Sequence, residues 1–430
     1  MLRSGTHAMR WFCALTALVA VGCQTRPEPS ASAPSAVPSA ECPEHLADGA
    51  DLGIEPVPTQ FEHSYGSIFC KYTEVQAPSG DPIRIFAQRE ISNEQLLYAR
   101  AVLEFYLEPV PGSRHGAEKT AIANKMAANG AILLMLKGYD GEFEIFEDEV
   151  WREIDGQPLY EDEIAAPGGT WYVDNVFEGH RDATFEEILH LVHDNGIGID
   201  VDGMPPGAAP EYQQEIRQAQ INALETEGLW AQDERTVDWI AELREEGSLT
   251  QEYLAAVVDS YYGLWGPYQE REGGMWGIYV AKTREEITEK DPLGYALMEA
   301  FLNPYLTFEA RIDPEFDGVF SMDFDESLPY THKSQYLTRA TLTGAQDSGL
   351  RGNEQDNTLQ GNPGSNLLAG GGGEDTAVFK GPMGEYDIEW DGQALVVTDT
   401  VAGRDGSDRL EAVEWLQFQD GRQSITEIGR

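Results

Sequence analysis

Apolar residues between positions 92 and 301 recur every three or four places, which is the spacing of amphipathic helices. The first such segment opens with Ser92 and Gln95 in the Ser-x-x-Gln form of a capping box, so a helix is expected to begin there. We predict helices over residues 92–107, 117–128, 184–195, 211–226, 235–244, 248–262 and 295–301.

Short apolar or alternating runs bounded by turn residues predict strands on both sides of this helical region. Asp-Gly pairs at 391–392, 405–406 and 420–421 are typical of tight hairpin turns. We predict strands over residues 67–76, 83–91, 131–136, 386–390, 394–398 and 413–418. The fold class expected from both patterns is α+β.

A third pattern has a period of nine and covers residues 343–378. Apolar residues recur at Leu350, Leu359, Leu368 and Ala377, and each lies two positions after a polar Ser348, Asn357, Asn366 or Asp375. Because each nine-residue block also has glycine at its first or second position, the segment resembles the hemolysin-type (RTX) calcium-binding repeats. The resemblance implies a short C-terminal parallel β-roll with an all-β cap over residues 336–430.

In this family Ca²⁺ lies between turns two repeats apart, held by Asp or Asn side chains and by carbonyl oxygens of glycine-rich turns. The turn at 352–357 is expected to pair with 370–375, and the turn at 343–348 with 361–366. The resemblance implies calcium-site residues Gly352, Asn357, Asn366, Gly370, Gly372 and Asp375. Asp375 is the strongest candidate because affinity for Ca²⁺ rises with ligand charge. A flexible linker rich in Gly and Asn is the alternative.

The composition is that of an acidic protein with enough apolar residues for a core. Its 75 acidic and 29 basic residues give a formal charge of -46, and 41% of residues are hydrophobic. Such a charge repels phosphates, so nucleic acid is excluded as a partner. The chain has no phosphate loop, dinucleotide fingerprint or G-x-S-x-G motif, so nucleotide-dependent and serine-hydrolase functions have no support.

The beginning of the sequence has the pattern of an export signal. Basic residues precede an apolar run over residues 11–21, and Ala20-Val21-Gly22 stands immediately before Cys23. This resembles a bacterial lipoprotein signal, which implies that residues 1–22 are removed and that a lipid on Cys23 anchors the protein in the membrane. Residues 23–41, rich in Pro, Ser and Ala, would then be a tether in the cell envelope, most simply at the outer membrane, facing the periplasm or the exterior. An ordinary cleaved signal peptide is the alternative.

Two cysteines remain in the part expected to fold, Cys42 and Cys70. Disulfides persist in exported proteins, so we expect these two residues to pair. The bond would join the end of the tether to the first hairpin and would be structural.

The helix predicted over 184–195 carries Glu186, Glu187, His190 and His193. Its form is similar to the active-site helix of zincin metallopeptidases, where H-E-x-x-H supplies two zinc ligands and a Glu that activates water. The resemblance implies that Glu186 and His190 are zinc ligands and that Glu187 is the catalytic general base. Glu186 stands where the family has its first histidine, and His193 is a further candidate ligand.

The same helix has a second interpretation. Thr184 and Glu187 have the form of a capping box, in which Glu187 bonds back to the N-cap amide while His190 and His193 lie on a surface turn. A third zinc ligand would come from Glu252, in a Glu-Tyr-Leu-Ala segment similar to the one that supplies a Glu in lethal-factor-like zincins. Glu252 as a solvated helix residue is the alternative.

Two functions therefore stay open. In the first, residues 42–335 form a zincin-like α+β domain with a degenerate metal helix, and the protein is a calcium-binding lipoprotein whose main domain cleaves a peptide or protein substrate with Zn²⁺. In the second, the protein is a calcium-stabilised surface module that binds or adheres to a partner without catalysis.

Overall fold

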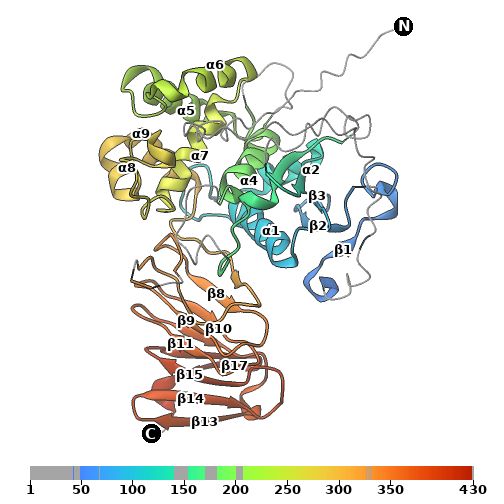
Figure 1. The fold of residues 1–430 in the computed structure, drawn as a ribbon, viewed down its shortest axis with the longest axis vertical. Coiled ribbons are helices and arrows are strands. Elements are labelled where there is room, and N and C mark those ends of the chain that lie inside the picture. Colours follow the sequence, from blue (N-terminus) through green and yellow to red (C-terminus); the bar gives the residue numbers. More distant parts are fainter. Residues whose placement is uncertain are drawn as a thin grey trace, which may run out of the picture.

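The computed structural model describes residues 42, 49–66, 68–139, 154–169, 182–199, 207–325, 327–328 and 331–428. Helices and strands are mixed, and the strands form three sheets with both parallel and antiparallel pairs. The helices gather at one end of the molecule, and a stack of short strands extends from them to the C-terminus (Figure 1). The predicted signal peptide, the predicted lipid anchor at Cys23 and the predicted tether lie outside the described residues.

The first sheet has five strands in the order β1-β2-β3-β4-β5. The strands are β1 (Glu55–Pro56), β2 (Lys71–Gln76), β3 (Pro82–Ala87), β4 (Ile132–Leu136) and β5 (Gln157–Tyr160). β2 and β3 form the antiparallel hairpin predicted from the sequence, whereas β3, β4 and β5 pair in parallel. The last of the described strands at this edge of the sheet is therefore β5.

Side chains of the central strands alternate between two apolar layers, because successive residues of a strand point to opposite faces. Ile85 and Leu133 belong to the main core on the helical side. Phe86 and Leu134 belong to a smaller cluster on the other face. Each face of the sheet thus packs against its own cluster of buried apolar residues.

Cys42 and Cys70 form a disulfide, the pairing expected from the sequence, with their Cα atoms 5.2 Å apart. Cys70 is buried and directly precedes β2. The bond therefore fixes the chain at the start of the first hairpin.

The helices predicted from the sequence are present close to their expected boundaries, together with an additional helix. The helices are α1 (Asn93–Leu107), α2 (Thr120–Asn129), α4 (Thr184–Val192), α5 (Pro210–Ile221), α6 (Val237–Glu246), α7 (Leu249–Tyr261), α8 (Arg284–Lys290) and α9 (Pro292–Phe301). The additional helix is α8; local caps explain some of the boundaries, whereas no side chain caps α4, α5 or α7. Ser92 and Gln95 form the predicted capping box of α1, and Gly130 ends α2 in the left-handed conformation. No helix in the described part of the chain is long and apolar enough to cross a bilayer.

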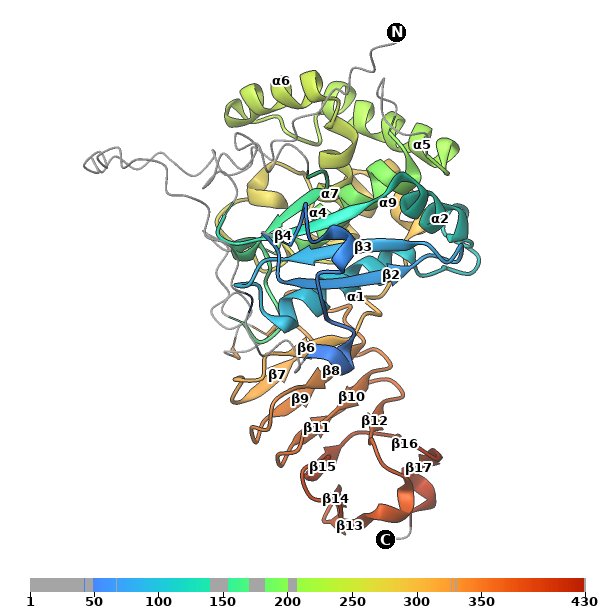
Figure 2. The same cartoon turned by 90° about the vertical axis from the view of Figure 1, so that its right-hand side faces the viewer.

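Two six-stranded sheets form the C-terminal part, which we call the two-sheet region (Figure 2). One sheet contains β6 (Ala310–Ile312), β8 (Arg339–Leu342), β10 (Thr358–Gln360), β12 (Thr376–Val378), β16 (Trp415–Phe418) and β17 (Gly421–Ser424). The other contains β7 (Val319–Ser321), β9 (Gly349–Arg351), β11 (Leu367–Ala369), β15 (Ser407–Glu411), β14 (Ala394–Asp399) and β13 (Tyr386–Asp391). From β6 to β12, consecutive strands alternate between the sheets and pair in parallel with the strand two places away.

The nine-residue period of the sequence corresponds to this alternation. Leu350, Leu359, Leu368 and Ala377 are all fully buried at the centre of their strands. The three predicted Asp-Gly turns lie between antiparallel neighbours near the C-terminus, as expected. The sheets begin earlier than the expected boundary at residue 336, because β6 and β7 pair with β8 and β9 although they lie outside the repeat at residues 343–378.

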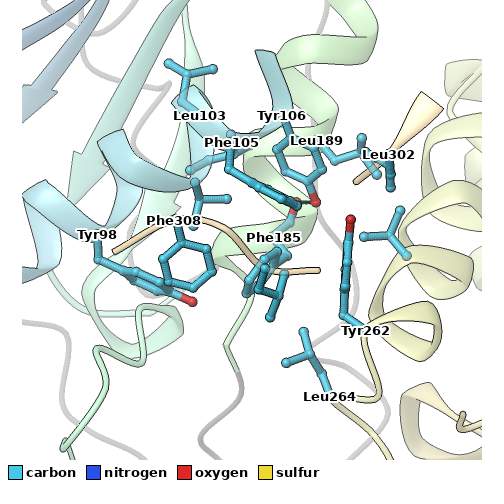
Figure 3. Packing of buried hydrophobic residues seen from close by; sticks show 14 of the residues in the cluster. Tyr98, Leu103, Phe105, Tyr106, Phe185, Leu189, Tyr262, Leu264, Leu302 and Phe308 are labelled. Atoms are coloured by element: carbon cyan, nitrogen blue, oxygen red, sulfur yellow. Dashed lines mark hydrogen bonds between the residues drawn. The ribbon is translucent and has the colours of Figure 1, made fainter. Parts of the chain in front are cut away.

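One apolar core runs without interruption from α1 through α4 and α7 into the two-sheet region. Phe308, two residues before β6, connects these parts (Figure 3). Its ring centroid lies 5.6 Å from that of Tyr98 on α1 and 5.9 Å from that of Phe185 on α4. The segment that leads into β6 is therefore packed against the helix that carries the candidate metal ligands.

Removal of the Phe308 ring should destabilise the whole chain. Phe308→Ala should lower the free energy of unfolding by about 3–5 kcal/mol, because it leaves a cavity among packed aromatic rings. Tyr305→Ala is the matched control, since Tyr305 lies in the same segment but is 39% exposed. Denaturant unfolding of both variants measures the difference, and equal losses would contradict the role given to Phe308.

Candidate metal centre

Helix α4 is buried on every side, although several of its residues are polar. All nine residues from Thr184 to Val192 are buried, including Glu186, Glu187 and His190. Its apolar residues pack on α1, α7 and the first sheet. The acidic and imidazole groups are therefore held out of water, where unpaired charge is costly.

The capping-box interpretation of Thr184 and Glu187 is wrong. The N-cap of α4 is Ala183, and no side chain caps the helix. The Glu187 carboxylate instead accepts a hydrogen bond of 2.6 Å from Gln157 Nε2 on β5. His190 is also 3% exposed rather than on a surface turn.

Three of the residues named from the sequence converge at one point. Glu186 and His190 lie one turn apart on α4, and α7 packs against this face and carries Glu252. One potential ligand atom from each residue lies within 4.8 Å of the other two, and all three residues are buried. No second group of three such side chains occurs within the described ranges. The interpretation of Glu252 as a solvated residue is therefore wrong.

The two nitrogens of His190 face different carboxylates. His190 Nδ1 lies 3.6 Å from Glu187 Oε2, and His190 Nε2 lies 3.8 Å from Glu252 Oε1. Burial lowers the pKa of His190, but the hydrogen bond with Glu187 and the charges of Glu252, Glu187 and Glu186 outweigh it and raise the pKa to about 10. The surrounding carboxylates thus favour the protonated imidazole when no metal ion is bound.

The donor set fits a divalent cation. His190 Nε2 is buried and makes no hydrogen bond within the described residues, so it is available as a ligand. Two carboxylates would neutralise a doubly charged ion, and imidazole with carboxylate is a donor combination used for Zn²⁺ and other transition metals. Three protein ligands are also the number found in catalytic zinc sites. Binding would require His190 to lose its extra proton.

His193, the fourth residue considered from the sequence, is not part of this group. Its Nε2 lies 2.5 Å from Gln213 Oε1 on α5, at the point where α4 continues into a π-helical turn over His193–Ile197. The structure thus assigns the two histidines of the motif to different neighbours, one to the carboxylates and one to α5.

Gln251 and Asp194, which were not predicted as site residues from the sequence, connect α7 to the turn that follows α4. Gln251 Nε2 on α7 donates to Asp194 Oδ1 at 3.0 Å. Burial raises the pKa of Asp194 to about 7, against the opposing effects of His190 and Gln251. A glutamine next to Glu252 looks like any surface residue in sequence, so no pattern could have indicated this contact.

The candidate calcium residues lie in turns that stack as expected. Asn357 N donates to Asp375 Oδ1 at 2.8 Å across 18 residues, and this contact joins the turns 352–357 and 370–375. A side chain at Gly352 would place its Cβ 2.0 Å from Gly370 O, and a Cβ at Gly370 would lie 2.1 Å from Ala412 O. These glycines are therefore required by the close approach of backbones, whatever ion binds.

The asparagines of the repeats close their own turns. Asn357 Oδ1 accepts from Asn353 N at 2.7 Å, and Asn366 Oδ1 accepts from Asn362 N at 2.8 Å. Both asparagines are buried. An internal hydrogen bond thus already engages each of these two side-chain oxygens, and the turns have a source of order besides an ion.

Asp375 differs from these asparagines in having a side-chain oxygen without a hydrogen bond in the described part of the chain. Its Oδ2 atom is buried and accepts no hydrogen bond within the described residues. Burial raises the pKa of Asp375 to about 6, with Glu414 and Asp356 adding to the effect and the hydrogen bond from Asn357 opposing it. Gly372 lies in the same turn, where its Cβ would meet the Glu354 side chain at 2.7 Å.

Asp408 has the same position relative to Asn366 at the sheet of β11 and β15 that Asp375 has relative to Asn357 at the sheet of β10 and β12. It was not predicted from the sequence. Its Oδ1 accepts from Asn366 N at 3.2 Å, as Asp375 accepts from Asn357 N. The hairpin formed by β13 and β14 interrupts the period before Asp408, so the repeat pattern could not reveal it. Burial raises the pKa of Asp408 to about 8.

The raised pKa of Asp408 predicts a pH-dependent stability. Between its ordinary value of 3.8 and about 8, the unfolded carboxyl is ionised while the folded one keeps its proton. Stability should therefore fall as pH rises through this window and remain low above it. Asp408→Asn should raise the free energy of unfolding at pH 8 by roughly 1–3 kcal/mol and leave it little changed at pH 4.

Thermal melting between pH 4 and pH 8 in the presence of a chelator measures this effect. Asp387→Asn is the control, because Asp387 is an exposed residue of β13. A destabilised Asp408→Asn variant at pH 8 would contradict the prediction.

Comparison with known proteins assigns no family to this chain. No family model matches it, and no curated protein matches it. What the centre can do chemically therefore follows from its own residues.

Proposed function

We propose that this protein is a metal-dependent hydrolase of peptides, in which Glu186, His190 and Glu252 hold a divalent transition metal such as Zn²⁺. The observation that carries the proposal is the convergence of these three buried side chains from two helices. A cation bound there would act as a Lewis acid and lower the pKa of water. The degenerate zincin-like interpretation of α4 supports the same reaction class.

The residues around the centre have separable roles in this proposal. Glu186, His190 and Glu252 bind the ion and offset its charge. Glu187, the next residue on the same helix, is the candidate general base, since a buried carboxylate beside the centre can take up a proton.

A peptide is the favoured substrate because of the neighbouring sheet. β5 is the last described strand at its edge, and Gln157 on β5 bonds to Glu187. An extended chain that added to this edge would run beside the centre.

Metal content tests the proposal directly. The purified chain should retain about one equivalent of Zn²⁺ after dialysis, and His190→Gln should lose both the metal and peptidase activity. His193→Gln is the matched control, because His193 is equally buried on the same stretch but bonds to Gln213. Mass spectrometry measures the metal content of each folded variant. Equal metal content in the wild type and in His190→Gln would refute the site.

A second candidate function rests on Asp375. In this alternative the protein is a non-enzymatic, calcium-stabilised surface module, and the two-sheet region is an RTX-type β-roll. The buried Asp375 Oδ2 between stacked glycine-rich turns supports Ca²⁺ binding there. A lipid on Cys23 would hold either form of the protein at the cell envelope.

Calcium should stabilise the full chain if Asp375 binds it. Extracellular calcium modules have a Kd of about 10⁻⁴ to 10⁻³ M, and a tenfold excess of ligand over Kd adds about 1.4 kcal/mol. The gain should appear as a higher melting temperature in calcium than in chelator, and Asp375→Asn should remove it. Identical melting of the wild type in both solutions would exclude this role.

A further inference from the structure

The Glu187 carboxylate faces the Nδ1 side of the candidate metal ligand His190, which gives it a second role besides that of general base. We propose that Glu187 is a positioning residue that orients the His190 imidazole for metal binding through Nε2. The inference rests on the proposed metal centre and adds a function for the residue next to the ligands.

The two sides of the His190 ring carry the argument. Nδ1 faces Glu187 Oε2 at 3.6 Å, and Nε2 faces Glu252 Oε1 at 3.8 Å, on the side of the ligand group. An imidazole that binds a metal through Nε2 keeps its remaining proton on Nδ1, and that proton needs an acceptor. Glu187 is the carboxylate on that side of the ring.

Glu187 is itself held in place from the sheet. Gln157 Nε2 on β5 donates to the same Oε2 atom at 2.6 Å. Both Glu187 and His190 are nearly inaccessible to solvent, at 2% and 3% exposure. The series Gln157, Glu187 and His190 therefore connects the edge of the first sheet to the ligand.

This arrangement explains why the Glu187 carboxylate lies between β5 and His190, which a capping role would not. A carboxylate at Glu187 bonded back to the N-cap amide would point away from His190, whereas the observed one spans from β5 to the ring. The consequence is that Glu187 contributes to metal affinity and not only to the reaction.

The test compares metal affinity in four variants of the full chain by competition with a chromophoric chelator. Glu187→Ala should weaken Zn²⁺ binding about 10–100-fold, the usual cost of losing such a partner of a ligand. Glu187→Gln should lose much less, because its amide oxygen still accepts the Nδ1 proton. Gln157→Leu should also weaken binding. Asp291→Asn, which alters a buried carboxylate bonded to Tyr253 and Tyr279, should bind as the wild type does.

A spectroscopic readout separates orientation from simple destabilisation. In the zinc-loaded wild type, ¹⁵N NMR of His190 should show a protonated Nδ1 and a ligated Nε2, and this signature should persist in Glu187→Gln. Zinc binding by Glu187→Ala as tight as that of the wild type would overturn the inference while leaving the proposed centre intact. Failure of the wild type to bind zinc would overturn both.

Discussion

The packing of α4 against α7 is the contact on which the rest of this protein's chemistry depends. It places Glu186, Glu187, His190 and Glu252 together and out of water. Burial of several carboxylates near one another is unfavourable unless a positive charge balances them. Without a metal ion, a protonated His190 would provide part of that balance, whereas a divalent cation bound in place of that proton would provide two positive charges. The helices can tolerate this arrangement because the apolar side chains of both are fully packed around it.

The two-sheet region is part of the same structural unit. Phe308 packs on Phe185, the residue directly before Glu186, so the segment that leads into the two-sheet region shares its core with the helix that carries two of the candidate ligands (Figure 3). Within the strands, order comes from two sources. Apolar residues fill the space between the sheets, and buried asparagines hydrogen-bond to the amides of their own turns. Asp375 Oδ2 is a buried oxygen without such a bond among the described residues, and unlike Asp405 Oδ1, which lies 3.2 Å from Lys380 Nζ, it stands between two stacked turns.

The two regions therefore use buried polar groups in different ways. In the turns, short-range hydrogen bonds satisfy nearly all of them, which stabilises a regular repeat. At α4 the carboxylates and the imidazole are arranged around one another with charge still to be balanced. That difference explains why a metal function is supported most strongly at α4, while in the two-sheet region it depends on one aspartate.

The sequence by itself determined the elements and the residue types. Capping residues, apolar spacing and the nine-residue period depend on local backbone preferences, so α1, the first hairpin and the strands from β9 to β12 appear where they were expected. It also named Glu186, His190 and Glu252. Only the tertiary structure decided that these three meet, that His193 turns to α5, and that Glu187 bonds to Gln157 instead of capping its helix. The physical reason is that each of these outcomes depends on which distant segment packs against α4, and the pattern of one segment contains no information about its neighbour in space.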